Sequence, residues 1–197
     1  MTQEAPRIPH LEPPYTEETQ QALAAMMPTD RSVDPLKLFR TIARDLPLGG
    51  AMAKLGQFML TGRRSGGAAY DLRTREIVID RVTARCGCEY EWGVHVMAFG
   101  AKAELTQEQI YSIVHGNGSD ACWSPKDAAA MNMVDQLHDT GHIEDTLWDA
   151  LGEHFDEPQL LELLVLAGWY HAISFFANGV RTEREVWAPR FPVQRDT

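Results

Sequence analysis

The chain has 197 residues, of which 44% are hydrophobic and 23% are charged, a composition that indicates a folded protein rather than a disordered one. Acidic residues outnumber basic ones by 28 to 18, and the net charge of -10 disfavours binding to nucleic acid or to a membrane surface, since both select for Lys and Arg. Three cysteines and the lack of an apolar leader predict a cytoplasmic protein rather than a disulfide-stabilised secreted one.

The first fifteen residues are rich in proline and predict an extended N-terminal arm. Such an arm either crosses a partner subunit or a functional site, or is a loosely ordered tail, and the sequence leaves both alternatives open. Residues 16–182 are expected to form a single helical domain, and residues 183–197 a C-terminal tail.

Capping residues and apolar spacing predict three helices before residue 61. The first follows Thr16 and ends near Met26, and the second begins at Asp34-Pro35, an N-cap followed by a first-turn proline. Pro47 is expected to interrupt the chain before a third helix over residues 48–60. The glycine-rich residues 61–67 are expected to form a loop.

The remaining residues predict helices over 71–85, 89–99, 107–115, 125–138 and 144–155, and a long apolar helix from 157 to about 178. The last one contains Glu162, His171 and Asn178, so we expect a central core helix rather than a membrane span. Residues 76–82 are rich in β-branched side chains, which favour a strand, but their flanks favour a helix. The predicted fold class is therefore all-α.

Four side chains share one face of the helix that is expected to begin near Cys88. Cys88, Glu91, Trp92 and His95 stand at positions i, i+3, i+4 and i+7. A tight turn would bring Glu76 from the preceding helix against His95, and a carboxylate beside an imidazole makes an acid–base pair. The helix start is expected to favour the thiolate form of Cys88. A single His or Cys on such a face is more often a core residue, so the prediction depends on the convergence of these groups.

Two further residues are candidates for substrate binding. Tyr90 offers a hydrogen-bond donor, although packing is the more common role at its position, and Arg81 offers a cation for a carboxylate, although a surface or intersubunit ion pair is more common. Trp92 is expected to pack in the core. His171 is expected to be a core histidine, with a second catalytic base as the alternative.

Two segments of the chain resemble the carboxymuconolactone decarboxylase family, which includes the alkyl hydroperoxidase D-like proteins. The first is Arg75 to Val82 followed by Arg85-Cys-Gly-Cys-Glu-Tyr-Glu-Trp-Gly-Val-His95, and the second is Glu162-Leu-Leu-Val-Leu-Ala-Gly-Trp-Tyr170 running into Asn178. The resemblance covers about residues 35–180. It implies an all-helical fold that assembles as a homotrimer or homohexamer, with sites near the subunit contacts.

The family divides by chemistry. In its hydroperoxidase branch a Glu, a Cys-x-x-Cys pair and a His form a relay, and the resemblance places Glu76, Cys88 and His95 on the Glu, the first Cys and the His. Glu91 occupies the second cysteine position, which removes the redox disulfide. A strained Cys86–Cys88 disulfide or a one-cysteine cycle through Cys88 is the alternative.

A metal site formed by Cys86, Cys88 and His95 is a weaker alternative. It would need Cys122 or His115 as a further ligand, and the spacing typical of zinc sites is missing. We therefore expect neither a metal nor a cofactor.

The decarboxylase branch lacks the paired cysteines and implies acid–base chemistry on small lactones that carry a carboxylate. Glu76, Glu91 and His95 fit that chemistry, with His95 as the acid or as the electrophile that stabilises an enolate. The sequence thus predicts a decarboxylase-like enzyme for a small carbonyl or lactone carboxylic acid. A thiol-dependent hydroperoxide reductase using Cys88 and a non-catalytic binding or assembly module are the two alternatives.

Overall fold

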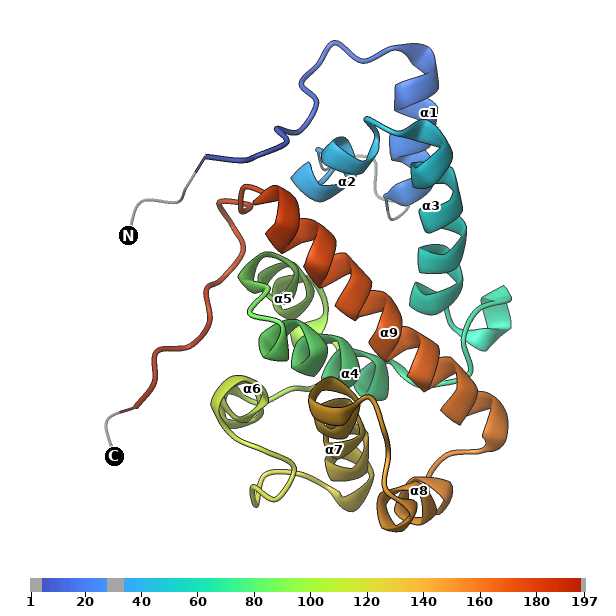
Figure 1. Ribbon diagram of the computed structural model, residues 1–197, viewed down its shortest axis with the longest axis vertical. Coiled ribbons are helices and arrows are strands. Elements are labelled where there is room, and N and C mark those ends of the chain that lie inside the picture. Colours follow the sequence, from blue (N-terminus) through green and yellow to red (C-terminus); the bar gives the residue numbers. More distant parts are fainter. Residues whose placement is uncertain (1–4, 28–33, 196–197) are drawn as a thin grey trace. The chain divides into compact units, whose positions relative to one another are not determined.

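The protein is described here by a computed structural model of residues 5–27 and 34–195, whose regular structure is helical (Figure 1). Within these residues the only β-type contact is an isolated bridge between Gly62 and Ala68. The helices are α1 (Glu17–Met26), α2 (Lys37–Ile42), α3 (Leu46–Leu60), α4 (Leu72–Arg85), α5 (Glu89–His95), α6 (Gln107–His115), α7 (Pro125–Thr140), α8 (Asp145–Gly152) and α9 (Glu157–Val180), with short turns η1 (Arg63–Ser65, 3-10) and η2 (Val96–Gly100, π). The all-α prediction is confirmed.

Two helix boundaries in the first half differ from those predicted. α2 begins at Lys37 rather than at Pro35, with Leu36 as its N-cap. Pro47 does not interrupt the chain: it lies in the first turn of α3, where its missing N–H has no helical partner to lose. Asp45 is the N-cap of that helix, because its carboxylate accepts a hydrogen bond from the Leu48 amide at 3.0 Å.

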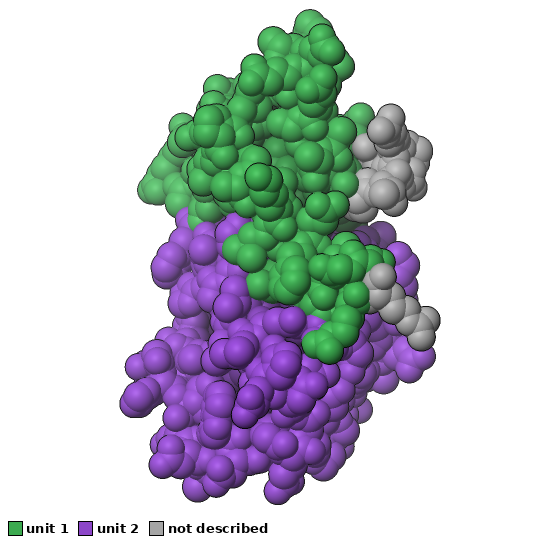
Figure 2. Space-filling model, turned by 90° about the vertical axis from the view of Figure 1, so that its right-hand side faces the viewer, with its two compact units in different colours: residues 1–68, 176–187 green, residues 69–175, 188–197 purple. Residues whose placement is uncertain are grey.

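The chain divides into two compact units, one of residues 1–68 and 176–187 and one of residues 69–175 and 188–197 (Figure 2). The residues that were expected to form one domain therefore fall in both units. In the first unit, residues of the N-terminal arm form backbone hydrogen bonds with later residues of the same chain. The Arg7 amide donates to the Val180 carbonyl at 2.9 Å, and the Leu11 amide donates to the Arg40 carbonyl at 3.2 Å.

The core of the second unit is built around α4, which packs against α5, α6 and α7. Ile77, Val78 and Ile79 are consecutive residues of α4 and all are fully buried. Consecutive residues of a helix point in different directions, so α4 is covered on every side. Any polar residue of α4 in this stretch is consequently held in the protein interior, where it needs a partner.

Residues 188–195 of the C-terminal segment pack on the second unit. The ring of Phe191 lies 5.1 Å from that of Trp92, and the Phe191 amide donates to Glu89. A Cβ atom at Gly93 would lie 2.4 Å from the Pro189 carbonyl oxygen, so only glycine allows the segment to approach α5 this closely. The packing role expected of Trp92 is confirmed.

α9 is the one helix among residues 5–27 and 34–195 that is long and apolar enough to cross a membrane. This is weak support for a membrane span, because the core helix of a soluble protein meets the same criterion. Leu163 and Leu166 of α9 are fully buried within the protein.

Candidate functional site

The turn between α4 and α5 brings Glu76 and His95 together, as the sequence predicts. His95 Nδ1 lies 2.8 Å from Glu76 Oε2, and the other oxygen of that carboxylate accepts a hydrogen bond from Arg75 Nε at 2.6 Å. Glu76 is completely buried and His95 is only 4% exposed. Burying a charged pair costs free energy unless each charge is compensated. Here the Glu76 carboxylate lies between two cationic partners, His95 and Arg75.

The second ring nitrogen of His95 faces two further site residues. The Tyr170 hydroxyl, supplied by α9, lies 3.0 Å from His95 Nε2, and Glu91 Oε1 lies 3.5 Å from the same atom. The Tyr170 and His95 rings meet edge to face, with centroids 5.0 Å apart. Glu91 thus joins the cluster as predicted, whereas Tyr170 was not among the residues singled out. The only sequence signal for it is its place at the end of the second family-like segment.

The carboxylates around His95 keep its imidazole charged. Burial lowers the pKa of His95, but the charges and hydrogen bonds of Glu76 and Glu91 outweigh burial and raise this pKa to about 10. Burial likewise raises the pKa of Glu76, whereas His95 and Arg75 lower it, and the net change is downward. At neutral pH Nδ1–H therefore donates to Glu76, and Nε2–H points at Tyr170 and Glu91 as a proton donor.

Asp80 is a third carboxyl group in this region, one helical turn after Glu76 on α4. It is fully buried, and neither of its carboxyl oxygens has a hydrogen-bond partner in the described part of the chain. Burial and the neighbouring Glu76 raise the pKa of Asp80 well above its usual range, despite the opposing charges of His95 and Arg75. Burial without a partner thus favours the neutral form of the Asp80 carboxyl group. Asp80 was not among the residues singled out from the sequence.

Cys88 takes the expected place as the N-cap residue of α5, but the expected thiolate is wrong. The residue is completely buried, and burial, together with the Glu91 carboxylate, raises the pKa of its thiol to about 12. The Glu91 amide and the Ser174 hydroxyl act in the opposite direction without reversing this result. Cys86, Cys88 and Cys122 form no disulfide, so the strained Cys86–Cys88 bond considered from the sequence is not present.

Arg81 lies away from the cluster, in an ion pair inside the second unit. Its Nε and Nη2 donate to the two carboxylate oxygens of Asp135 at 2.7 and 2.8 Å, and its Nη1 donates to the Ile113 carbonyl. Arg81 is 4% exposed and Asp135 is 19% exposed, so this ion pair joins two helices of the same chain and is mostly shielded from solvent. This arrangement argues against the substrate-binding role considered for Arg81 and assigns it a structural one. Tyr90 is buried, and its suggested role in substrate binding stays a prediction.

Phe99 of η2 is the half-buried residue that contacts both cations of the cluster. The Arg75 guanidinium lies 4.7 Å from the centre of the Phe99 ring, and the His95 ring lies 5.5 Å from it.

Two cavities lie in the second unit. One of about 640 Å³ is near the start of α4, and one of about 190 Å³ is between α7 and α9. Neither is lined by residues of the Glu76–His95 cluster.

We expect the charged state of His95 to make stability depend on pH in the neutral to alkaline range. The pKa of His95 rises from 6.5 to about 10 on folding, so its contribution is complete below pH 6.5 and is lost as the pH rises through 10. Asp80, whose pKa is also raised, adds to the loss in the same direction, whereas the raised pKa of Tyr170 lowers stability only above pH 10. Urea unfolding from pH 6 to 10 should show a smaller loss of unfolding free energy in His95→Gln than in the wild type. Equal losses would contradict a charged His95.

The segment that carries these groups matches a known family. Residues 51–136, which include Glu76, Glu91 and His95, match the sequence profile of the carboxymuconolactone decarboxylase family. This match covers less than half of the chain. The chain is also 28% identical over 95 residues to YdfG of Bacillus subtilis (strain 168), an uncharacterized protein. That match covers 47% of the chain and 63% of YdfG, so the chain spans less than two thirds of this relative's length.

Several solved structures share the fold. An uncharacterized peroxidase-related protein from Silicibacter sp. TM1040 has a TM-score of 0.75 at 14% identity, and 92% of each chain is covered. The debrominase Bmp8 has a TM-score of 0.70 at 11% identity, with 91% of this chain and 92% of Bmp8 covered. ATU0492 of Agrobacterium tumefaciens, suggested to be the antioxidant defence protein AhpD, has a TM-score of 0.62 at 17% identity. The match covers 74% of this chain and 95% of ATU0492. At these identities the likeness establishes the fold, and the named activities differ among the neighbours.

Proposed function

We propose that this protein is an acid–base enzyme of the carboxymuconolactone decarboxylase family that decarboxylates a small carbonyl or lactone carboxylic acid. The observation that supports the proposal most is the charged His95, which Glu76 holds through one ring nitrogen while the other ring nitrogen faces Tyr170 and Glu91. Ionisable groups are rarely gathered in a helical core without a function, because their burial is costly.

Each group has a role in the proposed reaction. Loss of CO₂ beside an enolisable carbonyl breaks a carbon–carbon bond, and its electron pair moves onto the carbonyl oxygen as an enolate. We assign to His95 Nε2–H the hydrogen bond to that oxygen, and to Glu76 the role of keeping the imidazole charged and oriented. The α-carbon must then take up a proton, which comes from the solvent.

The assembly expected from the family resemblance, a homotrimer or homohexamer, stays a prediction. It is supported by apolar side chains that α9 presents on the surface of the second unit. Leu161, Val165 and Phe175 are 65%, 49% and 67% exposed. Apolar residues at helical spacing on a surface are typical of contacts between proteins.

Two assays on the same purified protein test the proposed function. We expect CO₂ release from at least one member of a panel of small β-keto and lactone carboxylic acids, and this release should persist in Cys88→Ala. In parallel, hydroperoxide consumption with a dithiol reductant should stay at the level of the reaction without enzyme. Hydroperoxide turnover that is lost in Cys88→Ala would overturn the proposal in favour of a thiol peroxidase. Turnover in neither assay would favour a non-catalytic module.

A further inference from the structure

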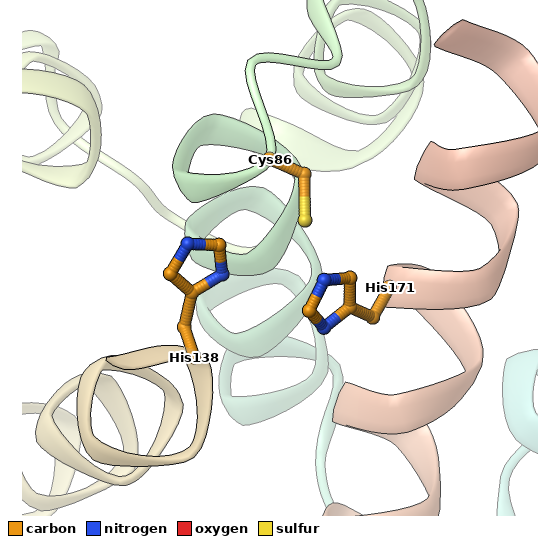
Figure 3. Close-up of side chains that lie close together, drawn as sticks. All are labelled: Cys86, His138 and His171. Carbon is orange, nitrogen blue, oxygen red and sulfur yellow. The ribbon is translucent and has the colours of Figure 1, made fainter. Parts of the chain in front are cut away.

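Three potential metal ligands converge within the second unit, away from the acid–base cluster. Cys86 lies at the C-terminal end of α4, His138 on α7 and His171 on α9. The Cys86 sulfur and one ring nitrogen from each histidine all lie within 4.8 Å of one another. Figure 3 shows the sulfur pointing toward the two imidazoles, which face each other across a narrow gap.

The surroundings of these side chains suit a bound cation. All three residues are half-buried, and the two imidazole rings are stacked with centroids 5.3 Å apart. His138 Nδ1 is a buried atom without a hydrogen-bond partner among the described residues, and an unpartnered nitrogen in such a place is costly. The nearby positive charge of Arg85 is balanced by ion pairs with Asp135 and Asp139.

We propose that Cys86, His138 and His171 form a binding site for a zinc ion. A thiolate and two imidazoles are ligands that zinc prefers, whereas magnesium and calcium take oxygen ligands. Zinc bonds of this kind place the ligand atoms about 3.3–3.8 Å apart in a tetrahedron, so the cluster must close by about 1 Å. Rotation of the three side chains supplies a movement of this size.

Three protein ligands leave a fourth position open for a water molecule or a small ligand. The cavity of about 190 Å³ provides the space, since His138 and His171 contribute to its lining together with Val134, Leu164 and other apolar residues. Bound zinc would also join the turn between α4 and α5 to α7 and α9. This proposal is independent of the proposed reaction, because none of the three ligands belongs to the Glu76–His95 cluster.

The proposed ligands differ from those of the weaker metal alternative considered from the sequence. That alternative combined Cys86 with Cys88 and His95, but Cys88 is completely buried and His95 is bound to Glu76 and Tyr170. His138 was given no role. The ligands lie 52 and 33 residues apart along the chain, so no local motif contains them.

Titration of the full chain with Co²⁺ after treatment with a chelator tests the site. We expect one Co²⁺ per chain, with the near-ultraviolet thiolate-to-cobalt band and the strong visible bands of a tetrahedral site, and displacement of Co²⁺ by Zn²⁺. Cys86→Ala and His171→Gln should weaken binding by roughly 100-fold or more, because even a ligand's hydrogen-bonding partner is worth 10- to 100-fold. The matched controls, Cys122→Ala and His142→Gln, should bind as the wild type does.

A second measurement avoids substitutions altogether. In the wild type, Zn²⁺ should protect Cys86 from alkylation at least 10-fold while leaving Cys122 unchanged, and peptide mass spectrometry distinguishes the two. No thiolate band in the wild type, or equal alkylation of Cys86 with and without Zn²⁺, would overturn the assignment. Binding that survives in Cys86→Ala and disappears in Cys122→Ala would overturn it as well.

Discussion

His95→Gln is expected to reduce kcat for the decarboxylation substrate by about 10²- to 10⁴-fold, the usual contribution of a positioned acid. Glutamine preserves most of the side-chain volume and one N–H donor, but it carries no positive charge and does not pair with Glu76 as an imidazolium does. The measurement is steady-state CO₂ release at saturating substrate, so that kcat is separated from KM.

The controls for this experiment separate loss of chemistry from loss of structure. His142→Gln changes an exposed histidine in the same unit and should leave kcat within twofold of the wild type. Glu76→Gln should also lower kcat, because His95 loses the carboxylate that keeps it charged. A His95→Gln variant with native circular dichroism and an unchanged kcat would rule out His95 as the acid.

Arg81→Met is expected to lower the free energy of unfolding by about 3 kcal/mol, since it leaves Asp135 without its bidentate partner inside the protein. We expect the lower end of the range for buried pairs because Arg85 Nε lies 3.7 Å from Asp135 and compensates in part. Urea unfolding measures the change. kcat should remain at the wild-type value under conditions in which the variant is folded.

Two further variants test whether the loss of stability comes from the Arg81–Asp135 pair. Disrupting the more exposed Arg85–Asp139 pair with Asp139→Asn should cost less than about 1 kcal/mol. Combining Arg81→Met with Asp135→Leu should recover much of the stability, because no unpaired charge then remains buried. A stable Arg81→Met protein with a strongly raised KM would instead support the substrate-binding role that the sequence suggested.

The parts of the site that lie close together in the sequence were predictable. Glu76 and His95 lie on consecutive helices joined by a short turn, and the spacing of Cys88, Glu91, Trp92 and His95 places them on one helical face. Helical periodicity and caps are local properties, so they predicted the helices and their approximate ends. The same local information predicted that Glu76 meets His95.

The state of each side chain was not predictable, because it depends on residues that approach from distant parts of the chain. Helix-start geometry alone favours a thiolate at Cys88, but complete burial reverses that effect. The sequence alone allows Arg81 to bind a substrate. In the folded protein its guanidinium group is instead paired with the carboxylate of Asp135 of α7. Tyr170 reaches His95 from 75 residues away.

The amino-acid sequence alone thus indicates an all-helical protein that resembles the carboxymuconolactone decarboxylase family, with a Glu–His pair and with Glu91 where a dithiol enzyme would have its second cysteine. Folding adds the buried Asp80 with its raised pKa, the charged imidazole of His95 and the Cys86–His138–His171 cluster. The physical reason is that periodicity and capping act over a few residues, whereas desolvation, charge pairing and metal-ligand geometry arise where separate helices meet.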